Sequence, residues 1–156
     1  MSLLDRIIKG PYPLQVFLFV VGVIAAGITA VAVMAQGYFV YQGHEVIPGA
    51  VHISETFFTG FLATFITGII LHRHASMGGQ CATLDLRGRC PFVGIFILGL
   101  SLGAVATLVV YFVQGTGDID YRNLVYTKGV QGLITGFITP YLFHYLKLLK
   151  HPMVAA

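Results

Sequence analysis

Four long apolar segments constrain this chain more than any other feature of its sequence. They span residues 14–38, 47–72, 92–113 and 124–149. Each is near the roughly 20 residues that a helix needs to cross the hydrocarbon core of a bilayer. Since 56% of all residues are hydrophobic and only 10% are charged, the chain has too few polar side chains to cover an ordinary water-soluble globule.

A segment surrounded by lipid must satisfy its own backbone hydrogen bonds, and segments of this length favour helices over the roughly ten-residue strands of a membrane barrel. We therefore predict an all-α fold, an integral membrane four-helix bundle in which residues 1–156 form a single transmembrane domain. Such a chain is a multi-pass protein of an inner, plasma or organellar membrane. Its first partner is the lipid bilayer.

The distribution of lysine and arginine predicts the orientation of the chain. Seven of these residues lie in the N-terminal region, in the middle connection or near the C terminus: Arg6, Lys9, Arg73, Arg87, Arg89, Lys147 and Lys150. The other two connections carry only Arg122 and Lys128. By the positive-inside tendency, the N and C termini and the middle connection are cytoplasmic. The formal charge of +3 then reflects topology, and we predict no nucleic-acid partner.

The second and fourth segments repeat each other. "GFLATFITGIILH" runs from Gly60 to His72 and "GLITGFITPYLFH" from Gly132 to His144, and every match between them keeps the same offset. The first and third segments match more weakly, at a slightly larger offset. Each copy crosses the membrane twice, so both enter from the same side. The sequence therefore predicts two parallel two-helix repeats and disfavours inverted ones.

Small residues follow one face of the second and fourth segments. Residues four apart share a helix face, and this face ends in histidine in both segments: Gly60, Thr64, Gly68 and His72, and Gly132, Gly136, Pro140 and His144. Such ridges let helices approach closely in lipid, which is typical of helix packing. A glycine face can also accept a flat porphyrin or a quinone ring. Pro140 is expected to kink the fourth helix.

His72 and His144 occupy matching faces of the two related segments, at matching depth. Two facing imidazoles are what bis-histidine ligation of a haem b iron requires. The same pair can instead hydrogen-bond a quinone carbonyl, or reach towards the lipid headgroups. The candidate cofactor-binding residues are His72, His144, Gly68 and Gly136, with haem b and quinone as candidate cofactors. His74 has no counterpart in the fourth segment, and with Arg73 it is expected to mark the exit of the helix from the membrane. The first and third segments contain no histidine, unlike the usual four-helix b-type cytochromes.

His52 and Glu55 lie one turn apart near the start of the second segment, where they share a helix side and can hydrogen-bond each other. An ionisable pair at the entrance to a membrane is a functional candidate, and we assign these residues to an outer mouth. If the helix begins near Val51, the pair instead caps it and faces water. No metal site is predicted, because Cys81 and Cys90 fit neither a CxxC pair nor a zinc-binding spacing.

These observations favour a small non-catalytic multispan subunit of a larger membrane complex. It would pack against other membrane subunits or against copies of itself, and it would line a haem or quinone site of a redox, electron-transport complex. The alternative is an oligomeric transporter or cation channel with an acidic outer mouth, formed by Glu45, Glu55, Asp118 and Asp120. A membrane enzyme is less favoured, because the sequence contains no nucleophile with an adjacent base. We predict no catalytic residue.

Overall fold

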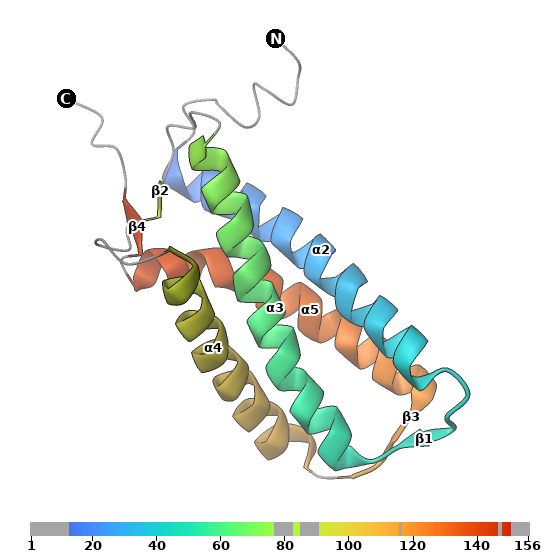
Figure 1. Ribbon diagram of the computed structural model, residues 1–156. Coiled ribbons are helices and arrows are strands. Elements are labelled where there is room, and N and C mark those ends of the chain that lie inside the picture. The colour runs from blue at the N-terminus through green and yellow to red at the C-terminus, as the bar shows by residue number, and fades with distance from the viewer. Residues whose placement is uncertain (1–12, 77–82, 85–90, 116, 147, 151–156) are drawn as a thin grey trace, which may run out of the picture.

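The computed structural model describes residues 13–76, 83–84, 91–115, 117–146 and 148–150. Its helices are α2 (Leu14–Tyr41), α3 (Gly49–Ser76), α4 (Pro91–Gln114) and α5 (Tyr121–Tyr145). They lie side by side in a bundle (Figure 1). The prediction of an all-α fold with four long helices is therefore confirmed for the described residues.

Proline and glycine mark several of the helix ends. α3 follows Pro48 and α4 begins at Pro91, where the missing N–H of proline removes no intrahelical hydrogen bond. Just beyond α2 and α4, the chain turns at Gly43 (φ +93°) and Gly115 (φ +70°). These left-handed backbone conformations favour glycine, so both turns are set by local sequence.

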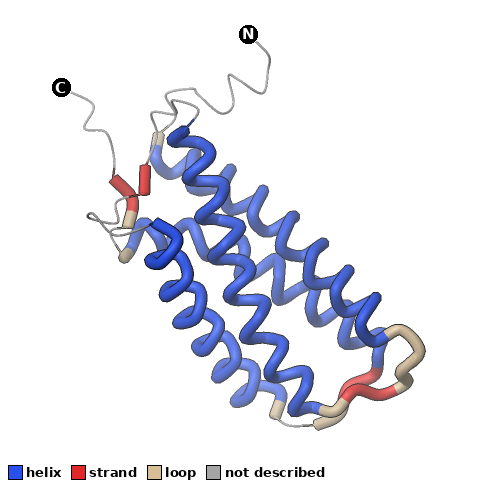
Figure 2. Tube along the Cα trace, viewed as in Figure 1, coloured by secondary structure: helices blue, strands red, loops and turns tan. Residues whose placement is uncertain are grey.

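Two short antiparallel strand pairs lie at opposite ends of the bundle (Figure 2). At one end, β1 (Val46–Ile47) pairs with β3 (Ile119–Asp120). At the other, β2 (Thr83–Leu84) pairs with β4 (Leu149–Lys150). The β1–β3 pair ties the α2–α3 connection to the start of α5. There the backbone N–H of Tyr121 donates to the carbonyl of Glu45 at 3.2 Å.

Glycine brings the helices together in two close pairs, α2 with α5 and α3 with α4. A β-carbon at Gly136 would lie 2.6 Å from the Cα of Ala26, and one at Gly132 would lie 2.7 Å from the Cα of Ala30. Between α3 and α4, a β-carbon at Gly60 would lie 2.9 Å from the Cα of Gly103. These distances are too short for any side chain, so the small-residue ridges serve backbone-to-backbone packing.

The helices differ in how many neighbours they pack against. α3 packs against all three other helices, whereas α4 packs mainly against α3. α5 changes direction along its length, with its red last turns running differently from its orange first turns (Figure 1). Pro140 is buried inside α5 and lacks the N–H that would bond one turn back, which is the physical reason to expect a bend there.

Two helices in the described part of the chain, α2 and α3, are long and apolar enough to cross a membrane. All four helices also carry exposed large apolar side chains, among them Phe39 at 74% and Phe112 at 80%.

Candidate functional site

Glu55 of α3 and Lys128 of α5 form an ion pair inside the bundle, near the β1–β3 end. The Lys128 side chain is 2% exposed and that of Glu55 is 12% exposed. The charge count had assigned Lys128 to an outer connection, and the structure corrects this by placing it within α5. A lysine this buried is rare without a partner, because an isolated ammonium loses its hydration there.

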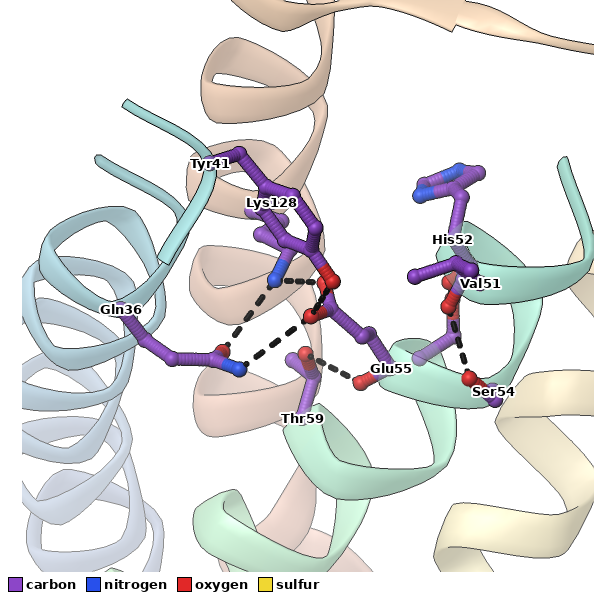
Figure 3. A network of polar contacts seen from close by, with 9 residues as sticks. Gln36, Tyr41, Val51, His52, Ser54, Glu55, Thr59 and Lys128 are labelled. Carbon is purple, nitrogen blue, oxygen red and sulfur yellow. Dashed lines mark hydrogen bonds and ion pairs between the residues drawn. The ribbon is translucent and has the colours of Figure 1, made fainter. Parts of the chain in front are cut away.

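Gln36 and Tyr41 of α2 complete the surroundings of the pair (Figure 3). The Tyr41 hydroxyl donates to Oε1 of Glu55. The Gln36 amide bridges the two charges: its Nε2 donates to Oε1 of Glu55 at 3.4 Å, and its Oε1 accepts from Nζ of Lys128 at 3.2 Å. Nζ also lies 5.5 Å from the centre of the Tyr41 ring, within the range of a cation–π contact. We call Gln36, Tyr41, Glu55 and Lys128 the Glu55 cluster.

The local sequence of each helix makes room for this cluster. A β-carbon at Gly37 would lie 3.0 Å from Cδ of Lys128, so the absence of a side chain lets the lysine stem cross α2. Lys128 precedes Gly132 by one helical turn, so it lies on the same face as the ridge that packs against α2. On α3, the Thr59 hydroxyl donates to the Glu55 carbonyl at 3.3 Å, a bond that leaves the carboxylate available to α2 and α5.

The cluster holds opposite charges on separate helices, joined by a network of neutral donors and acceptors. Removing two ions from water is costly, and their attraction offsets the cost only when further hydrogen bonds satisfy them. Here a phenol and an amide supply those bonds. The arrangement links three helices and can hold or exchange a proton. The described residues contain no group of three metal-ligating side chains.

Glu55 has its ion-pair partner on another helix, α5. The Glu55 carboxylate contacts Gln36, Tyr41 and Lys128, while the imidazole of His52 lies apart from it (Figure 3). His52 is itself buried, with 4% exposed, and its backbone carbonyl accepts from the Thr56 hydroxyl at 3.2 Å. Both outer-mouth candidates are therefore largely shielded from solvent, and the Glu55 carboxylate faces the bundle interior.

The histidines at the other end of the bundle differ in their exposure. His72 and His144 are exposed, whereas Gly68 and Gly136 are buried. His74, expected at the membrane exit, is 6% exposed, and its ring centroid lies 4.6 Å from that of Phe17. The backbone of α2 at Ala26 lies directly against Gly136. The space between α2 and α5 at Gly136 is therefore too small for a flat cofactor.

Gln36, Tyr41 and Lys128 were not predicted as site residues. One signal was available: extending the ridge of Gly136 and Gly132 back by one turn reaches Lys128, which places a charge on a packing face. No comparable signal identifies Gln36 or Tyr41, because their partners come from other helices. Comparison with protein-family models, with curated proteins and with solved structures gave no match.

Proposed function

We propose that this protein is a four-span integral membrane protein that works as a non-catalytic subunit of a larger membrane complex. The observation that carries the proposal is the apolar surface between the two ends of the bundle. Large apolar side chains are exposed along all four helices, including Val31 at 69% and Phe112 at 80%. A water-soluble bundle does not tolerate so much exposed apolar surface, whereas a lipid-facing one requires it.

The positions of the charges support the same proposal. The exposed charged side chains in the described part of the chain lie near the two ends of the bundle: Glu45, Arg73, Asp118, Asp120 and Arg122. Between the ends, Glu55 and Lys128 face inward and pair with each other. Charges inside membrane proteins are expected to be paired and to face the interior.

The packing also supports the proposed parallel repeat. If the first two helices repeat as the last two, then α2 corresponds to α4 and α3 corresponds to α5. The α2–α5 and α4–α3 pairs are then equivalent, and these are the two close pairs of the bundle. Under this proposal the β1–β3 end faces away from the cytoplasm, and both termini are cytoplasmic.

A subunit role fits the chemistry of the site better than catalysis. The Glu55 cluster joins three helices, and its carboxylate is engaged by Lys128, Tyr41 and Gln36. Under this proposal, His72 and His144 remain candidate contacts for a haem or quinone of a redox complex. Both are exposed on this chain, so such a ligand would be shared with a neighbouring subunit.

Membrane extraction and native mass test the proposal. We expect the tagged full-length protein to stay with membranes during alkaline carbonate washing. Extraction in a mild detergent should then give a particle heavier than this chain, with partner chains in fixed stoichiometry. Release by carbonate would refute membrane insertion. A pure homo-oligomer of this chain would refute the role as a subunit beside other chains.

A small transporter or cation channel is the second candidate, because the outer end is acidic and a buried charge pair lies beneath it. Glu45 and Asp120, together with Arg122, line a surface hollow of about 380 Å³ near β1 and β3. Reconstitution into liposomes separates the candidates. Cation or proton flux that disappears in Glu55→Gln supports transport, and the absence of flux in a purified complex supports the subunit role.

A further inference from the structure

A groove separates α4 from α5, and α3 forms its floor. It has a volume of about 350 Å³ and is lined by Gly60, Ala106, Val109, Gln131, Thr135 and Ile138, among others. This volume is at the lower end of the roughly 300 to 1,000 Å³ typical of small-molecule sites. The groove exists because α4 packs mainly against α3, which leaves the α4–α5 side of the bundle open.

The groove opens onto the apolar surface of the bundle. Val105 and Val109 on α4 are 56% and 55% exposed, and Ile134 and Ile138 on α5 are 54% and 45% exposed. No charged side chain of the described residues lines it. Access is therefore lateral, from the lipid-facing surface under the proposed function, and an ion would find no counter-charge there.

Gln131 provides polarity in this apolar groove. Both polar atoms of its side-chain amide are buried, and neither has a hydrogen-bond partner in the described part of the chain. An unsatisfied buried amide is costly, so its presence in a groove wall points to a ligand that hydrogen-bonds it. An amide carries both a donor and an acceptor. It can bond a carbonyl through Nε2 and a hydroxyl through Oε1.

The threonines of the groove narrow the ligand class. The Thr135 hydroxyl donates to the Gln131 carbonyl at 2.6 Å, and the Thr139 hydroxyl donates to the Thr135 carbonyl. The Thr56 hydroxyl donates to the His52 carbonyl at 3.2 Å. Their protons are used by the helices, so among these side chains Gln131 alone has donors to spare. The best complement is an uncharged ring with a carbonyl near Gln131 and an apolar tail in the lateral opening.

We propose that the α4–α5 groove binds a lipid-soluble quinone, with a ring carbonyl or hydroxyl on Gln131. This inference rests on the proposed membrane function and places the quinone away from His72 and His144. The groove supplies a ring-sized space, and the single amide suits both the quinone carbonyl and the quinol hydroxyl. No electron transfer by this chain is implied.

Photolabelling of the full-length protein in phosphatidylcholine nanodiscs tests this assignment. An azido-quinone is the label, decylubiquinone is the competitor, and mass spectrometry maps the labelled peptides. We expect labelling on α4 and α5 that decylubiquinone displaces and dioleoylglycerol does not. Displacement by dioleoylglycerol but not by decylubiquinone would overturn the quinone class and indicate a neutral lipid. Label confined to residues next to His72 and His144, with none on α4 or next to Gln131, would overturn the location.

Two variants make the test specific to the groove. Ala106→Phe fills it and should lower labelling by about tenfold, whereas Ala104→Phe, on an exposed position of α4 outside the groove, should not. Gln131→Leu keeps the side-chain bulk and should weaken decylubiquinone binding by about threefold to tenfold, the range for one hydrogen bond. Unchanged binding in both groove variants would overturn the proposal.

The membrane and quinone proposals fail differently. Carbonate washing is performed on the same preparation before reconstitution. Release from the membrane would refute the proposed function, on which the groove assignment rests. Protein that resists carbonate but takes no displaceable label would overturn the quinone assignment alone.

Discussion

Lys128 of α5 and Glu55 of α3 form an ion pair from which solvent is largely excluded, with 2% and 12% of their side chains exposed. Gln36 and Tyr41 of α2 hydrogen-bond the pair, so the contact connects three of the four helices. Buried pairs of this kind differ from surface ion pairs, because removing one ion leaves an unpaired buried charge. That charge destabilises the fold more than replacing both ions with uncharged side chains does. This asymmetry makes the cluster testable.

We expect Glu55→Gln or Lys128→Met alone to lower the free energy of unfolding by about 3 to 5 kcal/mol, because each leaves one buried ion without its counter-charge. The double variant Glu55→Gln/Lys128→Met should recover a large part of that loss. The free energy of unfolding of the two single variants and the double variant is measured by titrating the detergent-solubilised protein with SDS and monitoring circular dichroism. Glu45→Gln, which removes an exposed carboxylate, is the control and should change little. Strictly additive losses in the double variant would contradict the pairing.

Tyr41 makes two separable contributions to the cluster. Tyr41→Phe removes the hydrogen bond to Glu55 but keeps the ring near Lys128, and we expect a loss of about 1.5 to 3 kcal/mol. Tyr41→Leu removes both and should cost more. Tyr38→Phe alters an exposed hydroxyl of the same helix and serves as the matched control in the same unfolding assay. Equal effects at the two tyrosines would show that the Glu55 contact is unimportant.

Gly136 and Gly27 provide a matched pair for the helix packing. A β-carbon at Gly136 would lie 2.6 Å from the Cα of Ala26, whereas one at Gly27 would meet nothing within 4 Å. We expect Gly136→Ala to lower the free energy of unfolding by about 1 to 3 kcal/mol through overpacking against backbone. Gly27→Ala should be neutral or stabilising by up to about 1 kcal/mol, because alanine favours the helix. The reverse order would refute the α2–α5 packing.

An absorption spectrum tests the haem hypothesis for His72 and His144. We expect this chain, purified without partners, to be colourless, because both imidazoles are exposed and a haem between them would need a second chain to cover it. A Soret band with sharp α and β bands on reduction, lost in His72→Ala or His144→Ala, would contradict this expectation. It would establish haem ligation within the isolated chain.

Cysteine labelling tests the proposed orientation. His44 is exposed in the α2–α3 connection, and Cys81 and Cys90 lie in the middle connection, outside the described residues. In intact cells, an impermeant maleimide should label His44→Cys in a background with both native cysteines replaced by serine. In the native chain it should label Cys81 and Cys90 only after lysis. Labelling of the native cysteines in intact cells would invert the topology.

Much of the fold follows from local sequence. The long apolar segments predict the helices, and Pro48, Pro91, Gly43 and Gly115 lie at their ends because proline and glycine restrict or extend the allowed backbone. The small-residue ridges were predicted as packing faces, and the structure places Gly60, Gly132 and Gly136 against neighbouring backbone. The pairing of α2 with α5 was not predicted, because a ridge does not specify its partner.

The candidate site was less accessible to sequence reasoning. Glu55 was identified from its position near a membrane entrance, but its ion-pair partner on α5 was not predicted. His74 is buried against Phe17 whereas His72, two positions earlier, is exposed, and this difference was not predicted. Neighbouring residues on a helix point in different directions, so a difference of one or two positions reverses burial.

The sequence by itself determined that the chain forms apolar helices and which of their faces are small enough for close contact. These properties depend on local backbone preferences and on the transfer of each side chain from water. Only the tertiary structure decided that Lys128 meets Glu55, that Gln36 bridges them, and that a groove with an unsatisfied Gln131 remains between α4 and α5. Those relationships depend on how whole helices pack, which no single segment encodes.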